Sequence, residues 1–369
     1  MLSLEGKIFL DMAHQYPGPY CSMLLGDLGA DVVKIERPEG GDPARLLPGF
    51  FTSINRNKRS MTLNLKFPVA REVLYRLVEK ADIFTEGFRP GVAKRLEIDY
   101  QTLSAINPRL IYCSISGYGQ DGPYRDLPGH DLSYMGMAGV LECLKDNEGN
   151  PIAPGIAIGD LSSGMFATIG ILAALLAREK TGRGQYVDVS MFDGLVSLMG
   201  TRLGLFFDTG STERVMDAGY GIFKAGDGKH FTLSIAHEDW FWDQLCSAIG
   251  IEECKGISGM ERRERREELV ARLRSAFSKR SLDEWMEILQ KADVPCSPIH
   301  GFREVSEDPH IRFRHMIEDV ELSPDKSIRQ VGFPIKLSET PATIRRPSPD
   351  LGAHTEEILM QFGYSQAQI

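Results

Sequence analysis

The sequence predicts an α/β protein with a Rossmann-like large domain and a smaller α+β domain. Three observations lead to this prediction. Short apolar segments alternate with helical patterns early in the chain, which is typical of a doubly wound sheet. A strand, a helix and a second strand fit between residues 7 and 38, as in a parallel βαβ unit. The pattern changes near residue 210, so we expect the large domain at 1–210, completed by 325–369, and the small domain at 211–324.

The first elements form the βαβ unit. Residues 7–12 predict a strand, and the helix expected at 20–28 stops at Gly29, a natural C-cap. A second strand follows and ends at Pro38. No G-x-G-x-x-G motif follows the first strand, so the usual dinucleotide fingerprint is absent and a dehydrogenase is not indicated.

The other elements of the large domain continue the alternation. Residues 60–66 alternate in polarity and predict a strand, and residues 68–82 have apolar positions at helical spacing. Further strands are expected at 81–88 and 109–117. Two long helices are expected at 161–180 and 188–208.

The small domain begins with a hairpin pattern. Two strand-like segments flank a Gly-Asp-Gly turn at 226–228. Charged helical segments follow at 261–279 and 282–291. Proline-rich turns and a final helix at 354–363 end the sequence.

Composition excludes several classes of protein. The chain has 369 residues, is 42% hydrophobic and has a net charge of −9, so we expect a globular protein that does not bind nucleic acid. Six scattered cysteines without a C-x-x-C pair argue against a metal site or disulfides and favour a reducing cytoplasm. No signal-peptide pattern opens the sequence. Leu161–Ala177 is uncharged but too short to span a membrane, so we expect a buried helix and a cytoplasmic protein.

His130 and Asp160 are the first candidates for catalysis. Each lies beside a glycine at a predicted junction between a loop and a helix, where a side chain can face a cleft. An imidazole and a carboxylate facing one carbon could each add or remove a proton. Asp160 could instead be a helix N-cap, and Asp131 is expected to orient or cap the helix that it begins. Glu238 ends a predicted strand, where an exposed carboxylate at a helix start is the simpler interpretation.

Basic residues recur in loops after the predicted strands. Phosphate groups need such donors, and open α/β sheets bind ligands at the carboxyl ends of their strands. Solvated surface charge is the alternative for any one of these residues. The candidates are Arg37, Arg56, Lys58, Arg59, Arg89 and Arg95.

Six stretches together resemble the class III CoA-transferase superfamily. Their number and order are specific for that superfamily, and they extend over most of residues 7–200. The segment 128–134 and its 30-residue step to Asp160 look like the α-methylacyl-CoA racemase branch. The matching stretches are 26–38, 55–66, 86–96, 109–124, 128–134 and 170–193.

The resemblance implies two possible reactions. In the racemase branch the two bases fall on His130 and Asp160, with a supporting glutamate at Glu238, and the α-carbon of a 2-methylacyl-CoA thioester is inverted. In the transferases the same aspartate is a nucleophile that forms an aspartyl-CoA thioester. Racemases often have a glycine-rich run after this aspartate, whereas 161–165 is more similar to the transferases. We expect a racemase, with a CoA-transferase as the alternative and a non-catalytic CoA-binding subunit as a third possibility.

The resemblance also implies a ligand and a partner. The substrate would be an acyl-CoA, with no further cofactor required. The chain would form an interlocked homodimer in which the small domain of one subunit helps to close the site of the other. The CoA contacts would fall on Arg37, Thr62, Leu63, Asn64, Leu65, Glu86, Gly87, Phe88, Arg95, Gly129, Asp131 and Tyr134.

Overall fold

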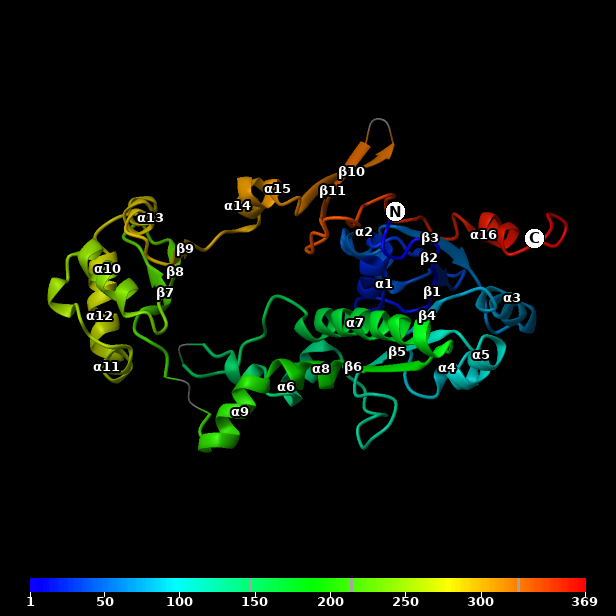
Figure 1. Cartoon of the computed structure of the whole chain (residues 1–369), viewed down its shortest axis with the longest axis horizontal. Helices are drawn as coiled ribbons and strands as arrows, with labels where there is room; N and C mark the ends of the chain where they lie inside the picture. Colours follow the sequence, from blue (N-terminus) through cyan, green and yellow to red (C-terminus); the bar gives the residue numbers. More distant parts are fainter. Residues whose placement is uncertain (147, 213–214, 324–325) are drawn as a thin grey trace. The chain divides into compact units, whose positions relative to one another are not determined.

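The computed structural model of the chain describes residues 1–146, 148–212, 215–323 and 326–369. These residues form two compact units (Figure 1). The large unit contains Met1–Gly204 and Arg312–Ile369, and the small unit contains Leu205–Ile311. The fold class predicted from the sequence is confirmed, because a parallel α/β sheet and a small antiparallel sheet lie in separate units.

The large unit is built on a six-stranded parallel sheet. Its strand order is β3-β2-β1-β4-β5-β6, so the first strand lies inside the sheet and the order reverses beside it. This is a doubly wound topology, in which ligands usually bind where the order reverses. The strands are β1 (Ile8–Asp11), β2 (Asp31–Glu36), β3 (Lys58–Thr62), β4 (Ile83–Glu86), β5 (Ile111–Ser116) and β6 (Tyr186–Ser190).

Helices cover both faces of this sheet because successive side chains of a strand point to opposite sides. Phe9 packs in a core with α1 (Pro17–Asp27) and α7 (Ile158–Thr181). Leu10 packs in a second core with helices of the other face. Those helices are α3 (Pro68–Val78), α5 (Tyr100–Ile106) and α16 (Thr355–Gln361).

Short helices complete the edge at which the strands end. The helices α6 and α8 share a small apolar core with Tyr134, Met135 and Leu195. The shorter elements are η1 (Pro43–Leu46), α2 (Phe50–Ile54), α4 (Val92–Arg95), α6 (Asp131–Met137), η2 (Leu141–Cys143), α8 (Met191–Leu198) and α9 (Gly200–Thr209).

Two predictions for the large unit are wrong in detail. The helix expected at 188–208 is preceded by β6, because 186–190 pairs with β5 and completes the sheet. The helix α7 is also only partly buried. Ile169 is 61% exposed and Leu176 is 70% exposed, although the core side of the helix packs against α1. Within the described residues, α7 is the one helix with the length and hydropathy of a membrane span, and its core contacts account for the apolar residues on the side that packs against α1.

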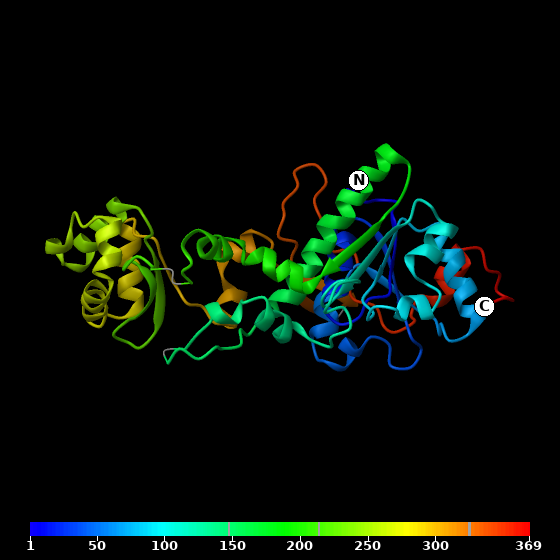
Figure 2. The same ribbon diagram turned by 90° about the horizontal axis from the view of Figure 1, so that it is seen from below.

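The small unit packs helices on one face of a short antiparallel sheet (Figure 2). The predicted hairpin is β7 (Tyr220–Lys224) and β8 (His230–Ser234), and β9 (Cys296–Pro298) extends it. Trp242, Phe277 and Trp285 fill its core. Its helices are α10 (Asp239–Ile249), η3 (Glu252–Cys254), α11 (Gly259–Glu264), α12 (Arg266–Phe277), α13 (Leu282–Lys291) and α14 (Phe302–Glu307).

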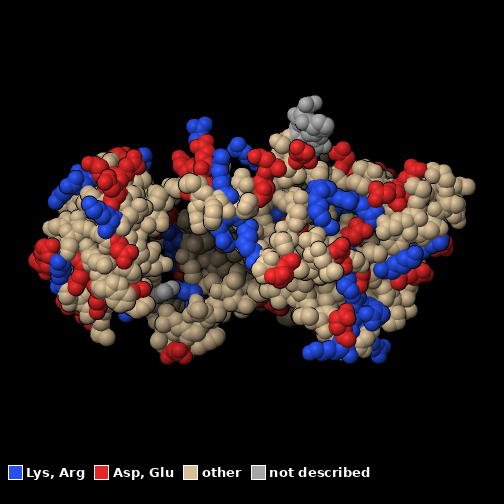
Figure 3. All heavy atoms as spheres, turned by 45° about the horizontal axis from the view of Figure 1, so that its top comes forward, with Lys and Arg blue, Asp and Glu red and all other residues tan. Residues whose placement is uncertain are grey.

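The chain returns to the large unit earlier than residue 325, the position expected from the sequence. The large unit resumes at Arg312, within α15 (Pro309–Phe313), and includes the hairpin of β10 (Ile317–Ser323) and β11 (Lys326–Val331). Arg56 donates a hydrogen bond to the carbonyl of Val331. This bond ties the hairpin to the large unit. On the face drawn in Figure 3, charged side chains of both signs are interspersed.

Candidate active site

A cavity of about 340 Å³ lies in the large unit where the parallel strands end. Its walls come from the carboxyl-terminal side of three neighbouring strands and from residues near the beginnings of α1, α6, α7 and α8. The lining segments are 13–18, which joins β1 to the start of α1, 87–90 after β4, and 115–118 at the end of β5. The topology predicts a ligand site at this edge. His130, Tyr134 and Asp160 all line the same cavity.

Asp160 lies in the first turn of α7, and Ala157, not Asp160, is the N-cap. The interpretation of Asp160 as an N-cap is therefore wrong. The Ala157 side chain makes no capping hydrogen bond. Among the residues that the structure describes, no protein group hydrogen-bonds the Asp160 carboxyl. Burial, with a smaller contribution from the charge of Asp131, raises the pKa of Asp160 to about 7. The carboxyl thus lines the cavity without a hydrogen-bond donor from the described residues.

Asp131 supports the start of α7 instead of its own helix. Its Oδ1 accepts a hydrogen bond of 3.0 Å from the backbone amide of Asp160. The prediction that Asp131 caps α6 is therefore replaced by a contact between α6 and α7. A Cβ atom added to Gly159 would lie 2.8 Å from Asp131 Oδ1, so the close approach needs a glycine. Asp131 thus fixes the backbone that presents Asp160.

His130 and Tyr134 bracket the first turn of α6. His130 is the N-cap residue of α6, and its side chain makes no capping bond. The Tyr134 hydroxyl donates a 2.7 Å hydrogen bond to the carbonyl of Gly129. Burial raises the pKa of Tyr134 to about 12, so this hydroxyl keeps its proton at neutral pH. Cβ atoms at Gly117 and Gly129 would lie 2.7 and 2.6 Å from the Tyr134 ring, which explains both glycines.

Glu86 orients the loop after β4. Its carboxylate accepts a hydrogen bond of 2.7 Å from the amide of Phe88 and another from the hydroxyl of Ser114. Burial raises the pKa of Glu86 to about 7. Gly87 and Phe88 line the cavity, whereas the Glu86 side chain points into the protein.

The other predicted CoA contacts of the large unit do not line this cavity. Arg37 donates to the carbonyl of Gly41, and Arg95 is exposed at the end of α4. Thr62 is the last residue of β3, residues 63–65 follow it, and Leu65 lies in the core. These positions remain predictions that depend on the resemblance: Arg37, Thr62, Leu63, Asn64, Leu65 and Arg95.

The basic segment after α2 is not available to a phosphate. Arg56, Lys58 and Arg59 are buried and form ion pairs with Asp27, Asp11 and Asp31, respectively. The interpretation of these three side chains as phosphate donors is wrong, because their charges are already neutralised.

Arg89 and Arg125 are the arginines that line the cavity. Arg89 was among the sequence candidates and Arg125 was not. Both side chains are exposed, so they can meet an anionic ligand without loss of a buried partner.

Glu238 belongs to the small unit, where it is the N-cap residue of α10. Its carboxylate accepts hydrogen bonds of 3.0 Å from the amides of Ala236 and His237. These bonds lower the pKa of Glu238 below its usual value. Its predicted supporting role stays a prediction.

Sequence reasoning missed the cavity wall formed by residues 13–18. This segment directly follows the first parallel strand. His14, Gln15 and Tyr16 all line the cavity. The position of a proline- and glycine-rich loop at a strand's carboxyl end was the available signal. Met191, at the start of α8, was also missed because β6 was not predicted.

The fold and the site define an α/β protein with a cavity that is lined by a carboxyl at the beginning of a helix. The family model described as CoA-transferase family III matches residues 4–355. The chain therefore belongs to CoA-transferase family III, and the superfamily indicated by the sequence motifs is confirmed.

Two relatives that cover nearly the whole chain are named as CoA-transferases. The chain is 34% identical to a succinyl-CoA:mesaconate CoA-transferase of Haloarcula marismortui, and the match covers 98% of this chain and 97% of the relative. It is 34% identical to a formyl-CoA:oxalate CoA-transferase of Rhodopseudomonas palustris, over 100% of this chain and 95% of the relative. These names favour the transferase alternative over the racemase that we expected from the sequence.

Solved structures have the same fold. A CaiB/BaiF family protein from Brucella suis superposes with a TM-score of 0.88 at 30% identity, covering 98% of this chain and 99% of the other. Rv3272 from M. tuberculosis gives a TM-score of 0.87 at 29% identity, covering 96% and 98%.

Proposed function

We propose that this protein is a CoA-transferase that moves CoA between carboxylic acids through Asp160. The main support is the Asp160 carboxyl itself, which lines the cavity without a hydrogen-bond partner among the described residues. A carboxylate that is not stabilised by donors is a better nucleophile than one that is. Its position in the first turn of α7 leaves backbone amides free to stabilise a developing oxyanion.

The proposed reaction proceeds in balanced steps. The Asp160 carboxylate attacks the thioester carbonyl, the C–S bond breaks, and CoA leaves as a thiolate from an acyl-aspartyl anhydride. The thiolate then attacks the aspartyl carbonyl, which releases the first acid and forms an aspartyl-CoA thioester. An acceptor carboxylate reverses both steps, so the acceptor leaves as a thioester and Asp160 is regenerated. No oxidant, reductant or external proton is needed.

We propose that small dicarboxylic acids are the acceptors. Two relatives are named for mesaconate and oxalate. The guanidinium groups of Arg89 and Arg125, on the wall of the cavity that contains Asp160, can hold a second carboxylate or a CoA phosphate. CoA would enter as part of the substrate. We also propose the homodimer, a reaction without a further cofactor, and a cytoplasmic location, which the free cysteines support.

An exchange assay tests this proposal. The protein is incubated with succinyl-CoA, acetyl-CoA or formyl-CoA and each of a panel of unlabelled mono- and dicarboxylic acids, and new thioesters are separated by chromatography. We expect ping-pong kinetics, and hydroxylamine should inactivate the enzyme only when an acyl-CoA is present, leaving a hydroxamate on Asp160 in peptide mass spectra. Absence of transfer over the whole panel would contradict the proposal.

The rate should depend on the protonation of Asp160. Because burial raises the pKa of Asp160 to about 7, the reactive carboxylate is lost as the pH falls through that value. We expect kcat/KM to decrease on the acid side with a midpoint near this pKa, measured in buffers of constant ionic strength. Burial raises the pKa of Glu86 to about 7 as well, so Glu86→Gln is the control. This variant should still show the decrease of kcat/KM on the acid side. A flat profile down to pH 5 would contradict a role for free Asp160.

Racemisation is the second candidate because His130 lines the same cavity as Asp160. The His130→Ala variant separates the two reactions. If His130 is a base, proton exchange at the α-carbon of a 2-methylacyl-CoA in D2O should fall by about 10²-fold or more. CoA transfer needs no second base, so it should fall less than about tenfold. Deuterium incorporation by the wild type without any CoA transfer would favour the racemase.

A further inference from the structure

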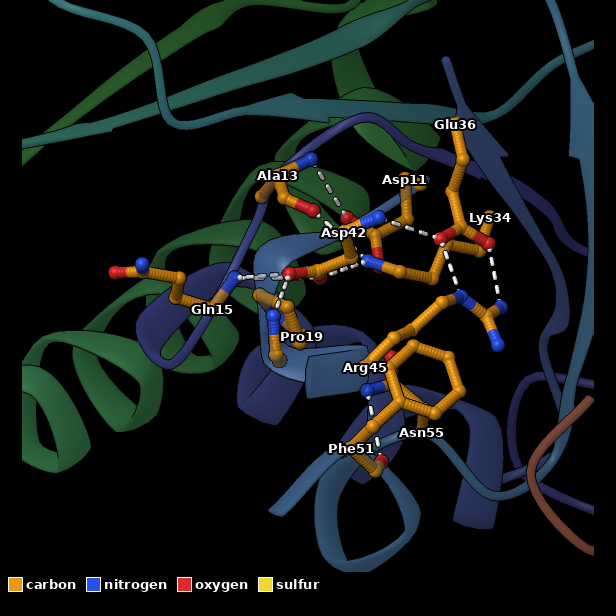
Figure 4. A network of polar contacts seen from close by, with 12 residues as sticks. Asp11, Ala13, Gln15, Pro19, Lys34, Glu36, Asp42, Arg45, Phe51 and Asn55 are labelled. Atoms are coloured by element: carbon orange, nitrogen blue, oxygen red, sulfur yellow. Dashed lines mark hydrogen bonds and ion pairs between the residues drawn. The ribbon is translucent and has the colours of Figure 1, made fainter. Parts of the chain in front are cut away.

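A network of buried charged groups lies under the loop that forms one wall of the cavity (Figure 4). Lys34 and Asp42 are both fully buried and form an ion pair of 2.9 Å. Asp11 and Lys58 are also fully buried and pair at 3.3 Å. Buried ion pairs are seldom more stabilising than apolar residues of the same volume. Stability alone therefore does not explain why these two ion pairs are buried here.

The network binds the backbone of residues 13–19 at four points. Lys34 Nζ donates to the carbonyl of Ala13 at 2.9 Å. Asp42 accepts from the amide of Gln15 at 3.0 Å, and Asp11 accepts from the amide of Ala13 at 3.0 Å. Lys58 donates to the carbonyl of Pro19 at 2.9 Å. The backbone on both sides of His14 is thus held by charged side chains.

The held backbone is in a conformation that it would not adopt readily. Gln15 has a φ of 59°, in the left-handed region that side-chain-bearing residues rarely occupy. Such a conformation costs free energy and persists only where its surroundings impose it. The bond from the Gln15 amide to buried Asp42 supplies that constraint.

The same loop is coupled to Asp160. Burial and, next, the charge of Asp160 raise the pKa of the Tyr16 phenol, so this ring lies within electrostatic range of the carboxyl. A Cβ atom on Gly164 would lie 2.7 Å from the carbonyl of Pro17, the first residue of α1, so the end of the loop also rests on α7. Gly164 is one helical turn beyond Asp160 and lies on the same side of the helix.

We propose that the Lys34–Asp42 ion pair is a positioning element that holds Gln15 in its left-handed conformation and presents His14, Gln15 and Tyr16 to the Asp160 cavity. Neither charged group lines the cavity, so both act through the backbone that they bind. The inference rests on the proposed function only for its kinetic consequence.

The test compares two buried aspartates. Asp42→Ala removes the acceptor of the Gln15 amide. Asp27→Ala is the matched control, because Asp27 is also fully buried and ion-paired, at 2.6 Å with Arg56, but has no bond to residues 13–19. Asp42→Asn keeps an acceptor oxygen and loses the charge. All three full-length variants are examined by hydrogen exchange, thermal unfolding and kinetics of CoA transfer.

We expect Asp42→Ala to accelerate exchange of the Gln15 amide by about tenfold or more, while Asp27→Ala leaves it unchanged. If the two variants have the same Tm, kcat should fall about tenfold or more in Asp42→Ala, with a smaller change in KM. The kcat of Asp27→Ala should not fall in this way. The exchange rate of the Gln15 amide and the kcat of Asp42→Asn should lie between those of Asp42→Ala and the wild type. Equal behaviour of the Asp42 and Asp27 variants in exchange and kcat would overturn the inference.

The exchange measurement separates this inference from the proposed function. If the wild type transfers no CoA, the proposed function fails. The inference is then decided by hydrogen exchange of the Gln15 amide and by the affinity of each variant for acetyl-CoA. If Asp42→Ala does not fold, Asp42→Asn is compared with Asp27→Asn by the same measurements. The inference would then be overturned if Asp42→Asn has the same hydrogen exchange at the Gln15 amide, the same affinity for acetyl-CoA and the same kcat as the wild type.

Discussion

Asp160→Asn is expected to abolish CoA transfer and to stabilise the protein above neutral pH. Loss of a covalent nucleophile should lower kcat by at least about 10³-fold, because the amide cannot form the anhydride. The nearby Asp131 carboxylate cannot replace it, since its Oδ1 is bonded to the amide of residue 160. Rates of thioester exchange and hydroxamate formation measure the loss. Residual transfer within tenfold of the wild type would contradict a covalent role.

The effect on stability follows from the raised pKa. Folding raises the pKa of Asp160 from 3.8 to about 7, so the folded state favours the protonated acid. The charged form destabilises the fold as the pH rises above the unfolded value, and the full cost is present above the folded value. At about 1.4 kcal/mol per pKa unit, removing the charge at pH 8 should stabilise the protein by up to about 4 kcal/mol.

Urea unfolding at two pH values checks this result. The difference between Asp160→Asn and the wild type should be large at pH 8 and small near pH 4. Asp193→Asn, in the first turn of α8, is the control because Asp193 also begins a helix but does not line the cavity. A stability difference that does not depend on pH would contradict the raised pKa.

Gly164→Ala is expected to impair both folding and turnover. The added Cβ would lie 2.7 Å from the Pro17 carbonyl and 3.0 Å from the Tyr20 ring, and a backbone carbonyl cannot move aside cheaply. Overpacking of this kind typically costs about 1–3 kcal/mol, which exceeds the gain of about 1 kcal/mol from the helix propensity of alanine. Because the clash separates the loop at 13–18 from α7, kcat should fall by about 10²-fold.

Gly170→Ala, in the same helix, is the matched control. Its added Cβ would lie 2.9 Å from the Val187 Cγ1 atom, so this side chain must shift, but outside the helix's own backbone no other atom lies within 4 Å. We expect its free energy of unfolding to fall less than that of Gly164→Ala, and its kcat to remain close to that of the wild type. Both variants are measured by urea unfolding and by CoA exchange. Equal losses of stability and of kcat would show that alanine is harmful at any glycine of α7, and would contradict a specific coupling between α7 and the segment at 13–18.

Much of the fold was predictable from local patterns. The strands β1, β2, β4 and β5 follow from apolar segments ended by polar or turn residues. The strand β6 was missed because it is only five residues long and the apolar run of α8 follows it at once. Its pairing with β5, not its own pattern, makes it a strand.

The candidate site was predicted in part. His130, Tyr134 and Asp160 were all identified, and they do line one cavity. Arg56, Lys58 and Arg59 were misinterpreted because the carboxylates that neutralise them lie far away in the sequence, at Asp27, Asp11 and Asp31. A single sequence cannot distinguish a basic side chain in solvent from one in a buried ion pair.

The sequence by itself determined the α/β class, the family and the two ionisable residues beside glycines, because periodicity and motifs are local properties. Only the tertiary structure decided which groups share the cavity and which are buried beneath it. It shows that Asp131 holds the amide of Asp160 and that Lys34 and Asp42 hold the loop at 13–18. The physical reason is that burial and pairing depend on residues brought together by the sheet, and these set both the charge state and the position of a side chain.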